Sequence, residues 1–204
     1  MKISSSCRTR LMSASLCLMI AAFILPTVPA AAQQGQSTMS NMNGAQNGPA
    51  NVTAADKKFV KDAAQGGLAE VELGRMATEK ASSDEVKKFG QRMVDDHTKA
   101  NDELKQVAQS KGIDIPTGLS AKDKMLKERL SKLSGPGFDR VYMQNMVKDH
   151  KQDVADFARE SRTGADPAVK DFASQTLPTL KSHLREAEKI APMTQSASTG
   201  TGSE

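Results

Sequence analysis

The sequence predicts an all-α protein built as a four-helix bundle, and two observations support this. Apolar residues recur at steps of three and four along four long segments, and no stretch alternates apolar and polar residues as a strand does. Two of the connections are tight, whereas the link over residues 112–136 is long and carries a short helix of its own. One long crossover between two hairpins predicts the up-down-down-up order of ferritin-like folds, with a plain up-down-up-down bundle as the alternative.

Capping signals predict where the first helices begin and end. Thr53 with Asp56 is typical of a capping box and opens the first long helix. The sequence SSDE at 82–85 opens the second, which is expected to end at Gly112. Ser120 is the expected cap of the short helix in the crossover.

The second half of the chain carries similar signals. A third long helix is expected over residues 137–162. The fourth begins at an Asp166 cap, with Pro167 at its first position, and is expected to end near Ile190. Pro178 lies inside this helix, so a kink or a local bulge is expected there.

Composition divides the chain into four parts. Residues 1–32 have a basic start, an apolar run and small residues before a cleavage point after Ala32, the pattern of a secretory signal peptide. Residues 33–52 and 192–204 have too few bulky apolar residues to order themselves and are predicted to be disordered. Residues 53–191 form the predicted bundle. We therefore expect a protein exported to the periplasm, with no transmembrane segment in the mature chain.

Composition also excludes several function classes. Both cysteines, Cys7 and Cys17, lie in the predicted signal peptide, so the mature chain has no thiol and no disulfide. Without the three basic residues of that peptide, 25 Lys and Arg remain against 24 Asp and Glu, a net charge of +1. With no basic block, no tryptophan and one tyrosine, nucleic-acid binding is not predicted. No nucleophile–base motif is present, so the sequence does not predict an enzyme.

The three histidines of the chain carry most of the chemical information. The similar sequences MVDDH and MVKDH end at His97 and His150, and the third histidine is His183. Each lies on the apolar stripe of a different predicted helix, so all three should point at the core. Glu70 holds the corresponding position on the first helix. At about 1.5 Å per residue, the four side chains lie roughly 16 to 25 Å from the turns that join their helices, at one level of the bundle.

This convergence predicts a possible metal site, and an alternative stays open. Three imidazoles and one carboxylate suit zinc, copper, iron or manganese. In the alternative, Glu70 pairs with a histidine and the four side chains form a buried polar network without metal, because a buried carboxylate needs a partner. The two functions that follow are an exported metal-binding bundle in metal handling or stress defence, and a metal-free structural or interaction module of the cell envelope. No protein partner can be predicted.

Further side chains could assist the site. Met93 and Met146 each precede a histidine by one turn, and their thioethers would favour copper, although their spacing favours the interpretation as ordinary core methionines. Asp153 and Glu186 lie near the predicted site and could hydrogen-bond to a histidine, as could Asp96.

Glycines flank Glu70 on the predicted first helix. Gly66, Gly67 and Gly74 lie within about one turn of it. Each costs the helix roughly 1 kcal/mol relative to alanine. They could leave space beside Glu70 or let a neighbouring helix approach, and the sequence favours neither.

Four stretches of the chain resemble a known family. FVKDAAQGGLAEVELGRMA, VKKFGQRMVDDHTKANDELK, GFDRVYMQNMVKDH and TLPTLKSHLREA are similar to the exported bacterial ferritin-like family named domain of unknown function four-one-four-two. The resemblance covers about residues 54–191 and implies a ferritin-like helical bundle, but no reaction. The histidine-bearing segments of the family match His97, His150 and His183, and its GGLAE segment matches Glu70.

The chain departs from di-iron proteins of that fold. Those proteins place a glutamate three residues before a histidine on two helices. The corresponding residues here are Val94, Val147 and Leu180. Bridging carboxylates are therefore missing, and ferroxidase chemistry is not predicted.

Overall fold

The computed structural model describes residues 52–196, which form five α-helices and no strand. The helices are α1 Ala54–Lys80, α2 Asp84–Ser110, α3 Ala121–Ser131, α4 Gly135–Thr163 and α5 Pro167–Ser196. None of these helices is both long enough and apolar enough to cross a membrane. The predicted signal peptide, nearly all of the predicted leader and the end of the predicted tail lie outside the described residues.

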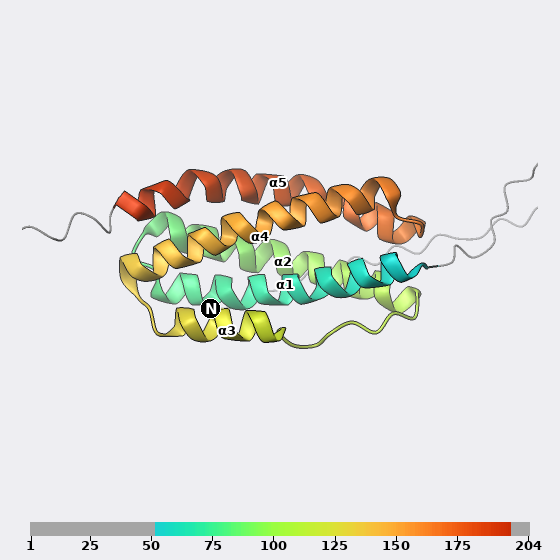
Figure 1. Cartoon of the computed structure of the whole chain (residues 1–204), viewed down its shortest axis with the longest axis horizontal. Helices are drawn as coiled ribbons and strands as arrows, with labels where there is room; N and C mark the ends of the chain where they lie inside the picture. The colour runs from blue at the N-terminus through green and yellow to red at the C-terminus, as the bar shows by residue number, and fades with distance from the viewer. Residues whose placement is uncertain (1–51, 197–204) are drawn as a thin grey trace, which may run out of the picture. The chain divides into compact units, whose positions relative to one another are not determined.

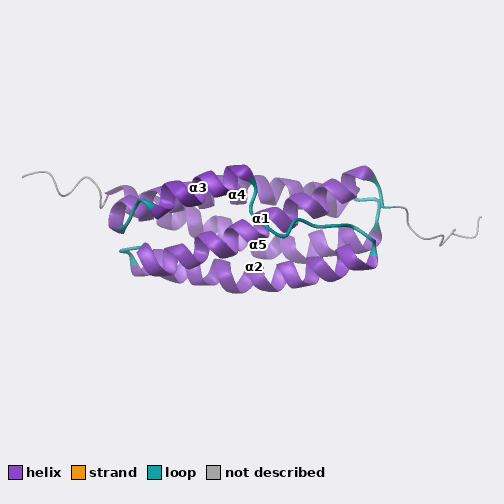
Figure 2. Cartoon of the chain, turned by 90° about the horizontal axis from the view of Figure 1, so that it is seen from below, coloured by secondary structure: helices purple, strands orange, loops and turns teal. Residues whose placement is uncertain are grey.

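The four long helices form the predicted bundle. α1 packs against α2 and α4 against α5 as two hairpins, α2 faces α5, and α1 faces α4 (Figure 1). The loop after α2 runs back along the side of the bundle to α3, which packs on α1 and α4 (Figure 2). α4 therefore runs in the direction of α2, and the predicted up-down-down-up order with one long crossover is confirmed.

Buried aspartates link the ends of the two hairpins. The Asp139 carboxylate, in the first turns of α4, accepts hydrogen bonds from the Ser82 N–H at 3.1 Å, the Ser82 hydroxyl at 2.6 Å and the Ser83 N–H at 2.9 Å. At the opposite end, Asp56 of α1 accepts a hydrogen bond from the Ala165 N–H at 3.0 Å. These contacts place the start of α4 at the α1–α2 turn and the α4–α5 turn at the start of α1.

The capping predictions are largely confirmed. Thr53 and Asp56 form a reciprocal capping box, and the Asp166 carboxylate accepts from the second and third N–H groups of α5 at 2.9 and 3.2 Å. The N-cap of α2 differs by one position from the prediction: it is Ser83. Ser82 cannot cap α2 because its hydroxyl is bonded to the α4 carboxylate.

α5 is longer than predicted. It is continuous through Pro178 and ends at Ser196 instead of Ile190, so residues 192–196 are helical and not part of a disordered tail. Packing explains the difference, because Ala191 and Thr194 are buried against the bundle. The Thr194 hydroxyl also donates to the carbonyl of Ala191 at 2.8 Å, which satisfies an acceptor near the helix end.

The hydrophobic core consists of two clusters, separated by the level of the histidines. The cluster nearer the α1–α2 turn includes Leu73, Phe89, Met93, Tyr142 and Met146. The cluster nearer the α4–α5 turn includes Phe59, Leu104, Phe157, Phe172 and Leu180. On each histidine-bearing helix, the histidine lies between residues of the two clusters.

The glycines of α1 have different roles. A Cβ atom on Gly74 would lie 2.6 Å from the carbonyl oxygen of Gly90, so this glycine allows α1 and α2 to approach closely. A Cβ atom on Gly66 would meet nothing within 4 Å, so this glycine leaves open space. At Gly67 the nearest atom would be the amide oxygen of the Asn101 side chain, at 2.0 Å.

Alanine substitutions should therefore have opposite effects at two of these positions. Gly66→Ala should raise the free energy of unfolding by about 0.5–1 kcal/mol, because alanine restricts the unfolded chain and favours the helix. Gly74→Ala should lower it by about 1–3 kcal/mol, because the methyl group would push two backbones apart. Urea denaturation of both variants measures this. Changes of the same sign would contradict the assignment.

Two carboxyl groups share a hydrogen bond at the end of the bundle near the α4–α5 turn. Burial, together with the hydrogen bond and the negative charge of Asp56, raises the pKa of Glu160 to about 7. Burial opposes ionisation of Asp56 as well, but hydrogen bonds from Thr53, Ala165 and Glu160 lower the pKa of its carboxyl to about 2. Below about pH 7, Glu160 therefore holds a proton that Asp56 accepts in a hydrogen bond.

Glu160→Gln should change how stability depends on pH. Between pH 4.5 and about pH 7, Glu160 loses its proton in the unfolded chain but keeps it in the folded protein, so its contribution to stability falls as pH rises. Glutamine removes this dependence, and the variant should gain on the order of 1 kcal/mol relative to wild type between pH 5 and pH 8. Thermal melts at both pH values measure the difference. Glu188→Gln, at the surface, is the control and should differ from wild type by the same amount at both pH values. The same result for Glu160→Gln would contradict the prediction.

Candidate metal centre

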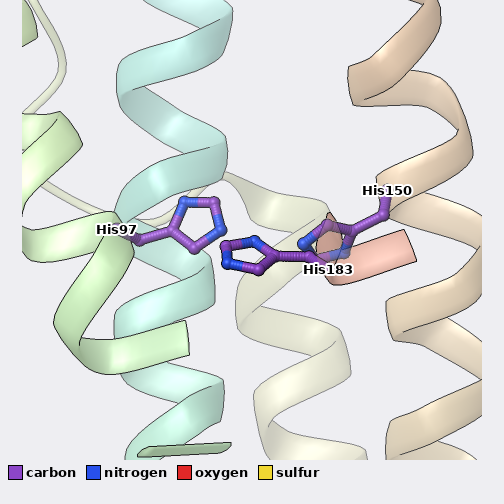
Figure 3. Close-up of side chains that lie close together, drawn as sticks. All are labelled: His97, His150 and His183. Carbon is purple, nitrogen blue, oxygen red and sulfur yellow. The ribbon is translucent and has the colours of Figure 1, made fainter. Parts of the chain in front are cut away.

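Three helices bring the three histidines of the chain together in the middle of the bundle. His97 of α2, His150 of α4 and His183 of α5 are 7%, 0% and 1% exposed. Their rings point toward one another (Figure 3). The ring centroids lie 5.8 Å apart for His97 and His150, 5.4 Å for His97 and His183, and 5.3 Å for His150 and His183.

Hydrogen bonds assign the tautomers of two rings. His150 Nδ1 lies 2.9 Å from the carbonyl oxygen of Met146, and His183 Nε2 lies 2.7 Å from a carboxylate oxygen of Asp96. Because a carbonyl and a carboxylate accept only, each of these nitrogens carries the proton and donates it. The other nitrogen of each ring therefore presents a lone pair.

One nitrogen of each ring has no hydrogen-bond partner in the part of the chain that the structure describes. His97 Nε2, His150 Nε2 and His183 Nδ1 are buried, and none has a hydrogen-bond partner among residues 52–196. One nitrogen can be chosen from each ring so that the three nitrogens lie within 4.8 Å of one another. Ligand nitrogens of a tetrahedral zinc ion are about 3.4 Å apart at bond lengths of 2.0–2.1 Å, so small side-chain rotations would bring the rings to coordination distance.

Burial keeps the three rings neutral. It lowers the pKa of His97 well below its usual value, and the neighbouring histidines lower it further. Burial and the charge of His183 lower the pKa of His150 to about 4. Burial also lowers the pKa of His183, although Asp96 acts in the opposite direction. Neutral imidazole is the form that binds metal, so the rings are ready to coordinate at pH 7.

A polar network outside the cluster holds Asp96 in position. The Arg92 guanidinium donates to Asp96 at 3.3 Å and to the Ser182 hydroxyl at 3.0 Å, and it forms an ion pair with Glu186. Glu186 is therefore bound to arginine and not to a histidine. The sequence analysis did not identify Arg92, although its spacing of four residues to Asp96 on one helix was a usable signal.

Glu70 lies beside the cluster but outside it. Its Oε1 is 3.9 Å from His150 Nδ1, the nitrogen that is already bonded to the carbonyl of Met146. The recorded approach of Glu70 is therefore to the protonated Nδ1 of His150 and not to the unpartnered Nε2. Burial, followed by the charges of Asp153 and Asp149, raises the pKa of Glu70 well above its usual value.

The remaining predicted side chains take other positions. Met93 and Met146 are fully buried in the hydrophobic cluster nearer the α1–α2 turn, and the recorded contribution of Met146 is its backbone carbonyl. Asp153 is half-buried near Glu70, and burial together with the charge of Asp149 raises its pKa to about 7. Among the described residues, the group that could hold a metal ion consists of the three histidines alone.

The fold and this site together define an all-α bundle with a buried centre of three histidines. Residues 41–190 match the family described as domain of unknown function (DUF4142). The match covers most of the 204 residues, and the chain belongs to this family.

One solved structure shows the same fold. It is the crystal structure of a DUF305 fragment from Deinococcus radiodurans, with a TM-score of 0.62 and 17% sequence identity. The similarity covers 70% of this chain and 98% of that one. At this identity the likeness supports the helical architecture alone. No curated protein matches the chain.

Proposed function

We propose that the protein binds a transition-metal ion through His97, His150 and His183. The observation that carries this proposal is the convergence of three buried imidazole nitrogens without a hydrogen-bond partner among the described residues. A buried acceptor left without a hydrogen bond costs about 1–3 kcal/mol. Three unpartnered nitrogens in one place are costly unless a ligand satisfies them together, and a metal cation can accept a lone pair from each of the three neutral rings.

The donor set favours zinc or copper. Imidazole suits zinc, copper, iron and nickel, whereas manganese prefers carboxylate and water ligands. Glu70 approaches the nitrogen of His150 that is already hydrogen-bonded, and the group of possible ligands that converges among the described residues consists of three imidazoles. Zinc commonly takes three protein ligands and leaves a fourth position for water or substrate. The carbonyl of Met146 and the carboxylate of Asp96 orient two of the rings, as outer partners of metal ligands commonly do.

The biological role we propose is metal handling or stress defence by an exported, periplasmic protein. Its support is the signal-peptide pattern of residues 1–32 together with the buried histidine centre. The alternative is a structural module in which the same side chains form a metal-free network. The hydrogen bonds of His150 and His183 favour that alternative only in part, because they leave one nitrogen of each ring unused.

Metal titration of the mature chain, expressed from Gln33 without a histidine tag, tests the proposal. All three histidines of the chain belong to the cluster, so any imidazole signal in a nitrogen-detected spectrum reports on this site. We expect one zinc or copper ion per chain and a large shift of all three ring signals. His150→Ala should lose the ion, and Asp102→Asn on the exposed surface of α2 should keep it.

The titration also decides between the two functions. A Kd of about 1 mM corresponds to a binding free energy of about –4 kcal/mol. If the wild-type chain binds neither zinc, copper, iron nor manganese more tightly than this, the proposal is wrong and the metal-free network is favoured.

A further inference from the structure

An acidic pocket of about 200 Å³ opens on the face formed by α1, α4 and the start of α3. We call it the acidic pocket. Its charged lining residues are Asp62, Glu70, Lys122, Asp123, Asp149 and Asp153. Larger pockets of about 470, 470 and 360 Å³ lie elsewhere, the first two along α1, α2 and the loop at 113–119 and the third between α1 and α4, and none of them is lined by a histidine.

The acidic pocket reaches from solvent to the edge of the histidine cluster. At its outer side, the side chains of Asp62 and Lys122 are 62% and 67% exposed. At its inner side, Glu70 is only 4% exposed, and its Oε2 has no hydrogen-bond partner in the described part of the chain. Its other oxygen lies 3.9 Å from a nitrogen of His150. A buried, unpartnered carboxyl group in the wall of an acidic pocket points to a cationic ligand.

A second, smaller cavity continues the path. It has a volume of about 30 Å³, and His97 is part of its wall. This is enough room for about one water molecule or a partly dehydrated ion. Gly66 and Asp153 line both this cavity and the acidic pocket. A side chain on Gly66 would enter open space, since no atom lies within 4 Å of a Cβ placed there.

We propose that divalent transition-metal ions reach the histidine cluster through the acidic pocket and then pass between Gly66 and Asp153. This inference rests on the proposed metal-binding function. The cluster itself is too buried for direct access from solvent, since no histidine is more than 7% exposed. Asp62, Asp123 and Asp149 give the outer part of the pocket an excess of negative charge over Lys122, which pairs with Asp149 at 3.3 Å, and such an excess speeds association with a cation. Gly66 keeps the passage between the pocket and the cavity open.

Stopped-flow mixing with Co²⁺ tests the route, because cobalt accepts imidazole ligands as zinc does and its visible absorption reports on coordination. Gly66→Leu should slow both loading and release by about tenfold or more while the Kd changes less than about twofold, since a plug alters the path and not the site. Asp149→Asn should slow loading by about threefold at low salt, and the difference should shrink at high salt.

Two variants serve as matched controls. Gly137→Leu places the same side chain at another helical glycine whose Cβ would meet nothing within 4 Å, and Asp102→Asn removes a charge from the α2 surface. Both should load at the wild-type rate. Circular dichroism confirms that each variant is folded.

The outcomes separate the two proposals. A wild-type chain that binds no Co²⁺ at equilibrium overturns the proposed function and, with it, the route. Wild-type binding combined with unchanged loading rates in Gly66→Leu and Asp149→Asn overturns the route alone. A Gly66→Leu variant that loses affinity through faster release, with unchanged loading, also overturns the route, because residue 66 would then act on the site itself.

Discussion

Zinc at a hundredfold excess over its Kd should raise the free energy of unfolding by about 2.7 kcal/mol, and His150→Ala should abolish this gain. The gain arises because only the folded bundle brings the three nitrogens together. For a domain of this size, the corresponding rise in Tm is roughly 5–10 °C. Melting curves recorded first with chelator and then with zinc or copper measure it. His97→Ala should behave in the same way, because both rings contribute one lone pair.

The metal-free stability of His150→Ala needs a separate control. Its ring is fully buried, so truncation leaves a cavity and should lower the Tm in chelator by itself. Val141→Ala removes buried atoms from the same helix without touching a histidine. It should lower the Tm in chelator and keep the full response to zinc. If wild type melts at the same temperature in chelator and in every metal, the metal proposal is wrong and the polar network stands.

Asp139→Ala should lower the free energy of unfolding by about 2–4 kcal/mol, because hydrogen bonds to a charged group contribute about 1.5–3 kcal/mol each and the donors are only part-buried. The carboxylate is 3% exposed and accepts three hydrogen bonds from Ser82 and Ser83. Without it, two backbone N–H groups at the α1–α2 turn lose their recorded acceptor. The substitution also removes the contact that joins this turn to the start of α4.

Urea denaturation of Asp139→Ala beside Asp102→Ala measures that effect. Asp102 is exposed on α2, and its loss should change stability by no more than about 0.5 kcal/mol. Asp139→Asn should fall between the two, because an amide keeps one acceptor oxygen but presents an N–H group to the remaining donors. A loss below about 1 kcal/mol for Asp139→Ala would contradict the role of this contact.

Helix periodicity was sufficient to predict the bundle and the inward direction of the histidines. The period of 3.6 residues is a local property, so the sequence alone places His97, His150 and His183 on buried faces. Their equal depth followed from helix rise and turn positions. The up-down-down-up order also followed from local features, since it depends on which connections are short.

Contacts between distant segments could not be predicted in the same way. Glu70 lies on the buried face of α1 as predicted, but the side of the His150 ring that it meets depends on the ring's tautomer and on how α1 approaches α4. The bond from Ser82 to Asp139 joins residues 57 positions apart, and no periodicity reports it. The last turns of α5 depend on the burial of Thr194, which composition alone does not reveal.

The three histidines lie between the two hydrophobic clusters, and this position affects how cooperatively the bundle unfolds. Each cluster buries its own set of apolar side chains, and units of this kind can open separately with different free energies. An ion held by α2, α4 and α5 would cross-link three helices at the boundary, so neither half could separate its helices there without breaking coordination bonds. Metal binding would then merge two opening units into one, and α1 would be the one long helix of the described bundle that the ion does not tie to the others.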